Sequence, residues 1–257
     1  MKLKSYTPCE RLKPYVKSFT IHEELKGQAY TVLPDTSFVM GFQYKGNLSY
    51  FLNGEEVHLA PFGVTGLRDS FRVFKNSPGI GSVLVFFKEG GAASFFKRPL
   101  HELFMQSTSL ENFMLRSELL LVEEQLQEAK TDLMKIRVVE NFLISKIASG
   151  ESEPDKLVMA CLHHIHKTNG NIKITELMKH LHTSQSPLEK RFRKTIGTSP
   201  KKYASIVRIK HIVESFKAGN AVFDMAYEAG YYDHAHFIKH FKAFTGVTPE
   251  KFFKSLK

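Results

Sequence analysis

The sequence predicts an α+β protein of two domains, a β-rich N-terminal domain that ends in a helical hairpin and an all-α C-terminal domain. Three observations support this. Short β-branched and aromatic runs separated by turn residues fill residues 1–107, helical periodicity begins at about residue 109, and a helix-turn-helix pattern in the last third occurs twice. We expect domains at 1–149 and 156–257, joined by a polar linker at 150–155.

The N-terminal runs are spaced like the strands of a sandwich or barrel, closed enough to hold a cavity. Asn53-Gly54 between two of them is a strong hairpin signal. Gly90-Gly91 ends the series, and a short helix should start at 92–96. The expected strands are 16–25, 29–33, 37–44, 48–52, 56–60, 64–68, 71–74 and 81–87.

Polar or aromatic residues at the strand ends are the candidates for lining a ligand pocket. Packing or surface roles are the alternative for each of them. Arg68 has the chemistry to pair with an anionic ligand. The candidates are Asp35, Phe42, Tyr44, Arg68 and Phe87.

Residues 109–149 contain two apolar stripes at helical spacing, separated by a turn at 129–132. One stripe runs from Leu110 through Leu119 and Leu120 to Leu126, and the other from Leu133 to Ile147. Two such helices pack either on the β-rich domain or on a second subunit.

The repeat in the last third appears when the chain is shifted by 49 positions. Phe192 then falls on Phe241, Gly197 on Gly246, and Pro200 on Pro249. Each copy reads as helix, tight turn, helix. Between them, 200–217 should form one helix of about 27 Å, comparable to the ~34 Å helical repeat of B-DNA. One chain would then place two recognition helices in successive major grooves.

Charge is divided unequally along the chain. Residues 155–257 hold 18 Lys+Arg and 8 Asp+Glu, whereas 1–154 hold 18 of each, so the whole excess of +10 lies on the segment with the repeat. A solvated basic surface would not require this division. The distribution favours a nucleic-acid-binding domain next to a neutral one.

Other function classes find little support. No nucleophile elbow, P-loop or dinucleotide fingerprint occurs, so we expect no catalytic residues and no cofactor. The histidines, including His163, His164 and His166, lack metal-ligand spacing. Cys9 and Cys161 do not form a disulfide framework, and signal peptide and transmembrane patterns are absent. We therefore expect a soluble cytoplasmic protein with no membrane association.

Two motifs carry a family resemblance that covers about 155–257. FRKTIGTSP (192–200) and AGYYDHAHFIKHFKAFTGVTP (229–249) resemble the AraC/XylS class of bacterial transcription regulators. More weakly, LKPYV, VLPD, GSVLVFFKEGGAASFF and PLHEL are similar to the sensor half of a subgroup of that family. The resemblance implies a jelly-roll or cupin-like sensor of a small-molecule effector, promoter DNA and RNA polymerase as partners, and a homodimer formed by the hairpin.

Residues opposite the buried phenylalanines of each recognition helix are the base-reading candidates. Family positions carried across the motif fall on Ser186, Glu189 and Lys190, and on Ala235, His236 and Lys239. The lysines have donors for guanine, while Glu189 either accepts from cytosine or pairs with Arg193. The full set is Gln185, Ser186, Glu189, Lys190 and Arg193 in the first helix and His234, Ala235, His236, Lys239 and His240 in the second.

Pro187 predicts that the first recognition helix starts with Ser186 as its N-cap. Five further lysines are expected to contact phosphates, which gives affinity without sequence information. These are Lys194, Lys201, Lys202, Lys242 and Lys251.

The sequence thus predicts a sequence-specific DNA-binding regulator, not an enzyme, whose N-terminal domain modulates promoter binding. One rival is a ligand-binding or docking module in which DNA binding is auxiliary. Another is a DNA-repair methyl acceptor, which would need a cysteine cluster that the chain lacks.

Overall fold

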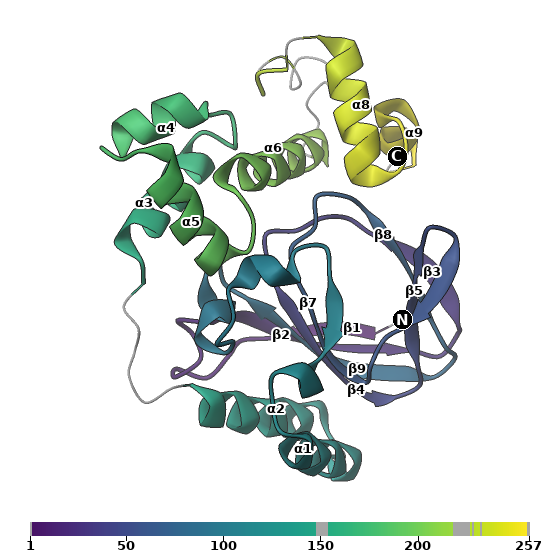
Figure 1. Cartoon of the computed structure of the whole chain (residues 1–257). Helices are drawn as coiled ribbons and strands as arrows, with labels where there is room; N and C mark the ends of the chain where they lie inside the picture. Colours follow the sequence, from purple (N-terminus) through teal and green to yellow (C-terminus); the bar gives the residue numbers. More distant parts are fainter. Residues whose placement is uncertain (1, 148–153, 218–226, 228, 232, 256–257) are drawn as a thin grey trace. The chain divides into compact units, whose positions relative to one another are not determined.

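The computed structural model describes residues 2–147, 154–217, 227, 229–231 and 233–255, and most of the expected linker at 150–155 lies outside them (Figure 1). Contacts divide the chain into two compact units. The first comprises Met1–Thr31, Ser37–Gly66 and Arg72–Glu153, and the second comprises Val32–Thr36, Leu67–Phe71 and Pro154–Lys257.

The first unit contains two sheets, whose described strand pairs are antiparallel. The larger has the strand order β1-β2-β9-β4-β7-β10 and the smaller β3-β8-β5-β6, which confirms the β-rich fold class. The strands are β1 (Lys2–Tyr6), β2 (Val16–Glu24), β3 (Gln28–Val32), β4 (Val39–Lys45), β5 (Leu48–Leu52), β6 (Glu55–His58), β7 (Phe62–Thr65), β8 (Arg72–Asn76), β9 (Ile80–Phe87) and β10 (Ser107–Ser109).

Local sequence signals predicted the turns of this unit correctly but did not predict the strands at the edges of the larger sheet. Asn53 (φ 53°) and Gly54 (φ 88°) form the expected tight turn between β5 and β6. Gly91 begins a short 3-10 helix, Gly91–Ser94, where a helix was expected to start. Strands β1 and β10 lie at the two edges of the larger sheet and were not predicted. Neither has an apolar alternation in its sequence, so only pairing with a neighbour identifies them.

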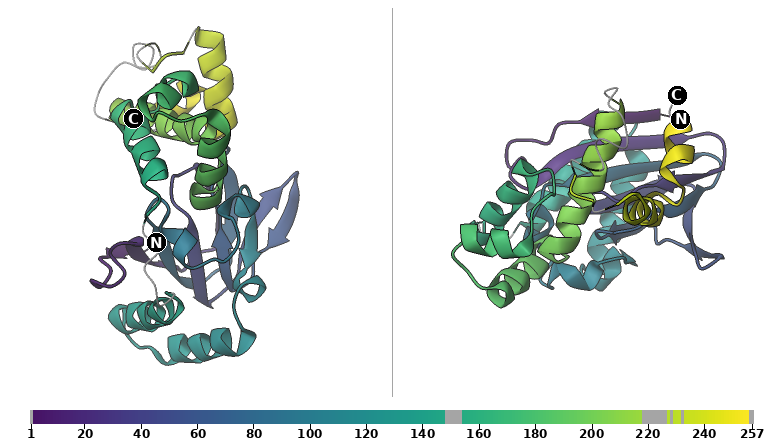
Figure 2. Two further views of the ribbon diagram at one scale, coloured as in Figure 1. Left: turned by 60° about the vertical axis from the view of Figure 1, so that its left-hand side comes forward. Right: turned by 90° about the horizontal axis from the view of Figure 1, so that it is seen from above.

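The helical hairpin covers one face of the larger sheet. Helices α1 (Arg116–Glu128) and α2 (Asp132–Lys146) lie side by side below the strands in Figure 1 and in the left view of Figure 2. The ring of Phe142 on α2 packs against Phe42 on β4, with centroids 5.7 Å apart. Leu119 is buried but Leu120 is 48% exposed, because neighbouring helical residues point about 100° apart and only one can face the sheet.

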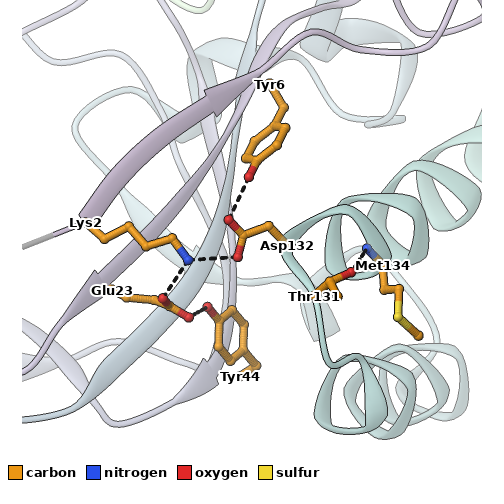
Figure 3. A network of polar contacts seen from close by, with 7 residues as sticks. All are labelled: Lys2, Tyr6, Glu23, Tyr44, Thr131, Asp132 and Met134. Carbon is orange, nitrogen blue, oxygen red and sulfur yellow. Dashed lines mark hydrogen bonds and ion pairs between the residues drawn. The ribbon is translucent and has the colours of Figure 1, made fainter.

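A network of polar contacts joins the start of α2 to the strands (Figure 3). Lys2 Nζ lies 2.8 Å from an Asp132 oxygen and 2.9 Å from a Glu23 oxygen. Tyr6 donates its hydroxyl hydrogen to Asp132 at 2.6 Å, and Tyr44 donates to Glu23 at 2.8 Å. These contacts lower the pKa of both carboxyl groups, mainly through the hydrogen bonds from Lys2.

The second unit is helical, as expected. The helices are α3 (Lys156–Lys167), α4 (Ile174–His180), α5 (Gln185–Ile196), α6 (Pro200–Lys217), α8 (His234–Thr245) and α9 (Pro249–Lys254). Helix α6 has the 18 residues that the sequence predicted. Gly197 and Gly246 end α5 and α8 in the left-handed conformation, with φ of 93° and 87°. The expected first helix of the second copy lies mostly outside the described residues.

Candidate nucleic-acid interface

Helix α5 has one buried and one exposed side. Leu188, Phe192 and Ile196 are buried, and the Phe192 ring packs against Tyr203 of α6 with centroids 5.6 Å apart. On the opposite side Gln185, Ser186, Lys190 and Arg193 are exposed. The periodicity therefore identified correctly which side of this helix is exposed.

Glu189 is engaged by its own helix. Its carboxylate accepts a hydrogen bond from Gln185 Nε2 at 2.8 Å and lies 3.5 Å from Arg193. Of the two roles considered for Glu189, the structure contains the pairing with Arg193. The carboxylate therefore partly neutralises the guanidinium of Arg193.

The start of α5 differs from the prediction. Ser184, not Ser186, occupies the N-cap position, and Gln185 is the first helical residue. Ser186 and Pro187 are the second and third residues of the helix. Proline is tolerated there because the first N–H groups of a helix have no carbonyl partner within it. The helix is therefore longer at its N-terminus than Pro187 implied, and Ser186 lies on its exposed first turn.

Helix α8 repeats the arrangement of α5 with different chemistry. Phe237, Phe241 and Phe244 are buried, while His234, Ala235, His236 and Lys239 are exposed. Asp233 caps the helix, because its carboxylate accepts a hydrogen bond from the His236 backbone N–H at 2.7 Å.

The two equivalent lysines, Lys190 and Lys239, are both exposed. Within the described residues neither has a hydrogen bond or ion pair to another side chain. Their ammonium groups are therefore available to an outside acceptor.

His240 lies elsewhere than predicted. Its Nε2 is 2.7 Å from Ser205 Oγ on α6, and its Nδ1 is 2.6 Å from the Tyr231 hydroxyl. A neutral ring satisfies both contacts, with one nitrogen donating and the other accepting. Burial, together with Arg208 and His236 nearby, lowers the pKa of His240 below its ordinary value. His240 therefore links α8 to α6, and we remove it from the base-reading set.

Arg208 on α6 completes this link between the two halves of the repeat. Its guanidinium donates to the Gly170 carbonyl through Nε at 3.2 Å and Nη2 at 2.7 Å, and lies 5.6 Å from the centre of the Tyr231 ring. Gly170 belongs to the first half and Tyr231 to the second. We call Ser205, Arg208, Tyr231 and His240 the α6–α8 junction. No sequence pattern marks this junction, since a lone arginine on a helix is usually a surface residue.

The apolar part of this contact is one core shared by α6, α8 and α9. It contains Ile206, Ile209 and Ile212 from α6 and Phe237, Phe241, Phe244 and Phe253 from the later helices. Helix α6 thus packs on α5 through Tyr203 and on α8 through this core (Figure 1).

The lysines predicted to contact phosphate are all exposed. Lys194 lies in the last turn of α5, Lys201 and Lys202 begin α6, and Lys242 and Lys251 lie on α8 and α9. As for metals, no group of three or more His, Cys, Asp or Glu side chains among the described residues is placed to hold an ion. Nor is any helix in that part of the chain long and apolar enough to cross a membrane.

The five predicted ligand-lining residues are not brought together. Phe42 and Phe87 are fully buried, Phe42 beneath the helical hairpin and Phe87 against Phe95. Tyr44 belongs to the polar network at the start of α2. Arg68 is buried, and Asp35 accepts a hydrogen bond from the Thr36 N–H at 2.5 Å. A shallow cavity of about 130 Å³ between β7 and α1 contains none of the five.

Two family matches divide the chain along the same line as the fold. Residues 177–255 match a family described as a helix-turn-helix domain, and residues 4–109 match a domain of unknown function, DUF6597. The Msm operon regulatory protein of Streptococcus mutans is 28% identical over 160 residues, which are 61% of this chain. The match spans only 56% of that protein's length.

Among solved structures, a crystal structure of ToxT from Vibrio cholerae has a similar fold. Its TM-score is 0.50 at 14% identity, and the match covers 93% of this chain and 98% of ToxT. At this identity the likeness concerns the fold alone.

Proposed function

We propose that this chain, which belongs to the AraC/XylS family of DNA-binding transcription regulators, reads promoter DNA with α5 and α8 in successive major grooves. The family places it among regulators rather than enzymes. The observation that carries the proposal is that both recognition helices expose a matching lysine while α6 packs against both helices.

The α6–α8 junction supports a fixed spacing of the two readers. A polar contact between partly buried groups requires defined positions, because hydrogen bonds weaken steeply with distance and angle. Ser205, His240 and Tyr231 form such a series, with distances of 2.7 and 2.6 Å. A rigid pair of readers selects half-sites at one separation, about one helical turn apart.

Within this mechanism base reading and phosphate contact fall to different side chains. Base edges are read by exposed residues of each helix, with Lys190 and Lys239 as guanine donors. The phosphate-contacting lysines provide sequence-independent affinity. Gln185, Ser186 and Arg193 in α5 and His234, Ala235 and His236 in α8 complete the reading surface.

The N-terminal unit is proposed as a sensor that modulates this binding. Its two sheets and its match to an uncharacterised domain family support a role distinct from DNA contact. The ToxT structure was determined with (E)-4-(8-methylnaphthalen-1-yl)but-3-enoic acid bound, which supports a small-molecule effector here. The regulator would act in the cytoplasm by recruiting or blocking RNA polymerase.

The helical hairpin is proposed as a homodimer contact. Although α1 and α2 bury several side chains each, Leu121 on α1 and Leu133 on α2 are 55% and 60% exposed. Exposed apolar side chains are typical of protein–protein contacts where they form a continuous patch. Sedimentation of the full chain, compared with a Leu121→Glu, Leu133→Glu variant, tests this: the wild type should be dimeric and the variant monomeric.

The DNA-binding proposal is tested by selecting bound sequences from a random duplex pool with the full-length protein. We expect two half-motifs about 10 base pairs apart, centre to centre. Selection with Lys190→Ala and with Lys239→Ala should each degrade a different half-motif. If the wild type enriches no sequence at moderate salt, the reading proposal is wrong and DNA binding is at most auxiliary.

A further inference from the structure

The face of the larger sheet that turns away from the hairpin remains partly exposed. Directly paired residues of adjacent strands point to the same side, and Val39 pairs with Phe86 while Gly41 pairs with Leu84. These residues are all half-exposed, whereas Phe42, which alternates with them, is fully buried. We call this second side the inner face. It is an apolar surface that the protein's own side chains do not cover completely.

The smaller sheet presents a row of aromatic side chains toward the inner face. His22 lies on this face, because it alternates with Ile21, which shares the side of Phe42. The His22 ring is 6.4 Å from Tyr30 on β3, and Tyr30 stacks on Phe74 at 6.1 Å. Tyr50 on β5 is 6.2 Å from Phe74 and extends the row. The row of rings thus adjoins the half-exposed side chains of Leu84 and Phe86 on the inner face.

Arg72 lies at the end of this row. It is only 7% exposed, and its guanidinium lies 4.2 Å from the centre of the Tyr50 ring. Its Nη1 donates to Ser107 Oγ at 2.9 Å, and its Nη2 donates to the Met105 carbonyl at 2.8 Å. Ser107 Oγ is 3.0 Å from Thr65 Oγ1, and Thr65 pairs with Val39 on the inner face. The guanidinium therefore reaches the edge of the exposed apolar surface.

The charge of Arg72 is not balanced by these contacts. A hydroxyl, a carbonyl and a phenol ring are all formally neutral, and among the described residues no carboxylate forms an ion pair with Arg72. Burial lowers the pKa of Arg72, because removal from water penalises the charged form. A buried cation normally has an anionic partner. The guanidinium retains N–H donors in the planar arrangement that binds a carboxylate through two oxygens.

We propose that the inner face binds a small organic carboxylate, with its acid group on Arg72 and an apolar or aromatic body between Leu84, Phe86 and the ring row. This rests on the proposed sensor function and names the chemical class of its effector. The ligand supplies the missing negative charge and covers the exposed apolar surface. Specificity for acids over neutral analogues follows, since an uncharged group leaves the guanidinium uncompensated.

Calorimetric titration of the full-length protein tests the proposal with two acids and their matched primary amides. The pairs are cinnamate with cinnamamide and octanoate with octanamide, which keep the body and remove the charge. At least one acid should bind about tenfold or more tightly than its amide. Arg72→Gln should remove that preference by weakening the acid about tenfold, with the amide unchanged. Arg98→Gln is the matched control, because Arg98 is an exposed arginine of the same unit.

Two further variants keep the test decisive. If Arg72→Gln does not fold, Arg72→Lys is used instead. It retains the charge but loses the bidentate hydrogen bonding of the guanidinium, so it should reduce the preference for the acid over the amide. Leu84→Trp fills the inner face and should weaken acid and amide alike. The proposal is wrong if neither acid binds, if amides bind as well as acids, or if the Arg72 variants keep the preference. Sequence selection without ligand is independent of these results, so the DNA-reading proposal can stand when this one fails.

Discussion

The two recognition helices occupy equivalent positions in the repeat but differ in charge and in attachment. Helix α5 carries four Lys/Arg and one Glu, whereas α8 carries two Lys and three His and no acidic residue. Helix α5 meets α6 through ring packing of Phe192 on Tyr203, while α8 adds the polar contacts of His240. The difference implies that α5 contributes more salt-dependent affinity and α8 a more closely fixed orientation.

The largest expected effect comes from the buried phenylalanines that attach each helix. Phe192→Ala and Phe241→Ala should each lower the free energy of unfolding by ~3–5 kcal/mol. The Phe241 loss should be the greater, since its ring contacts three others, Phe237, Phe252 and Phe253, at 5.2–5.5 Å. Urea unfolding followed by circular dichroism measures both. Ile238→Ala, at a site 38% exposed on α8, is the control and should cost far less. If the two substitutions lowered the free energy of unfolding equally, α5 and α8 would be attached to the domain with equal strength.

A smaller effect is expected from the paired lysines. Lys190→Ala and Lys239→Ala should each weaken binding to the selected duplex by ~1–3 kcal/mol and change affinity for random DNA much less. Lys254→Ala on α9 serves as an exposed control. Equilibrium binding to both duplexes gives the specificity ratio directly. A ratio that Lys239→Ala leaves unchanged would exclude Lys239 from base reading and leave α5 as the main reader.

The attachment of α8 through His240 predicts a pH dependence that α5 does not share. Because the folded-state pKa of His240 is lowered, the unfolded chain binds more protons as pH falls through its ordinary value of 6.5. The contribution to stability is therefore complete above that value and is lost progressively below it. The urea midpoint of the wild type should fall between pH 7.5 and pH 5.5, and it should fall by more than the midpoint of His240→Gln does. Equal falls would show that protonation of His240 is not coupled to folding.

How far the sequence predicts these differences depends on the kind of signal. The C-terminal ends of α5 and α8 follow from the glycines at 197 and 246, and the start of α6 follows from the proline at 200. The start of α5 was predicted two residues too late. The junction could not be found in this way. His240 and Arg208 look like surface residues on a helical wheel, and only the packing of α6 against the Gly170 turn and Tyr231 encloses them.

The β-rich unit shows a second limit. Alternation along β4 separates Phe42 from Val39 and Gly41 correctly, but both sets are apolar or small, and nothing in the strand says which side the hairpin covers. Phe42 and Phe87 were therefore predicted to line a pocket although they lie in the core. Arg72 was overlooked for a related reason, since its burial depends on Tyr50 and Ser107, which are distant in sequence.

The smallest expected effect concerns the internal pairing that distinguishes α5. Glu189→Gln removes the carboxylate that engages Arg193, which should cost about 0.3–0.5 kcal/mol of stability, because the pair lies at the surface of the helix with Arg193 half-exposed. The same change should increase DNA affinity at low salt, since Arg193 becomes available to phosphate. The slope of log affinity against log salt should then steepen by about 0.9, the value for one added phosphate contact.

Glu128→Gln, an exposed change on α1, controls for net charge alone and should leave the slope unaltered. A loss of affinity in Glu189→Gln confined to one half-motif would mean something different. It would assign Glu189 to base reading, with its carboxylate accepting a hydrogen bond from cytosine. Glu189 would then contribute to the choice of DNA sequence, and neutralising the charge of Arg193 would not be its main role.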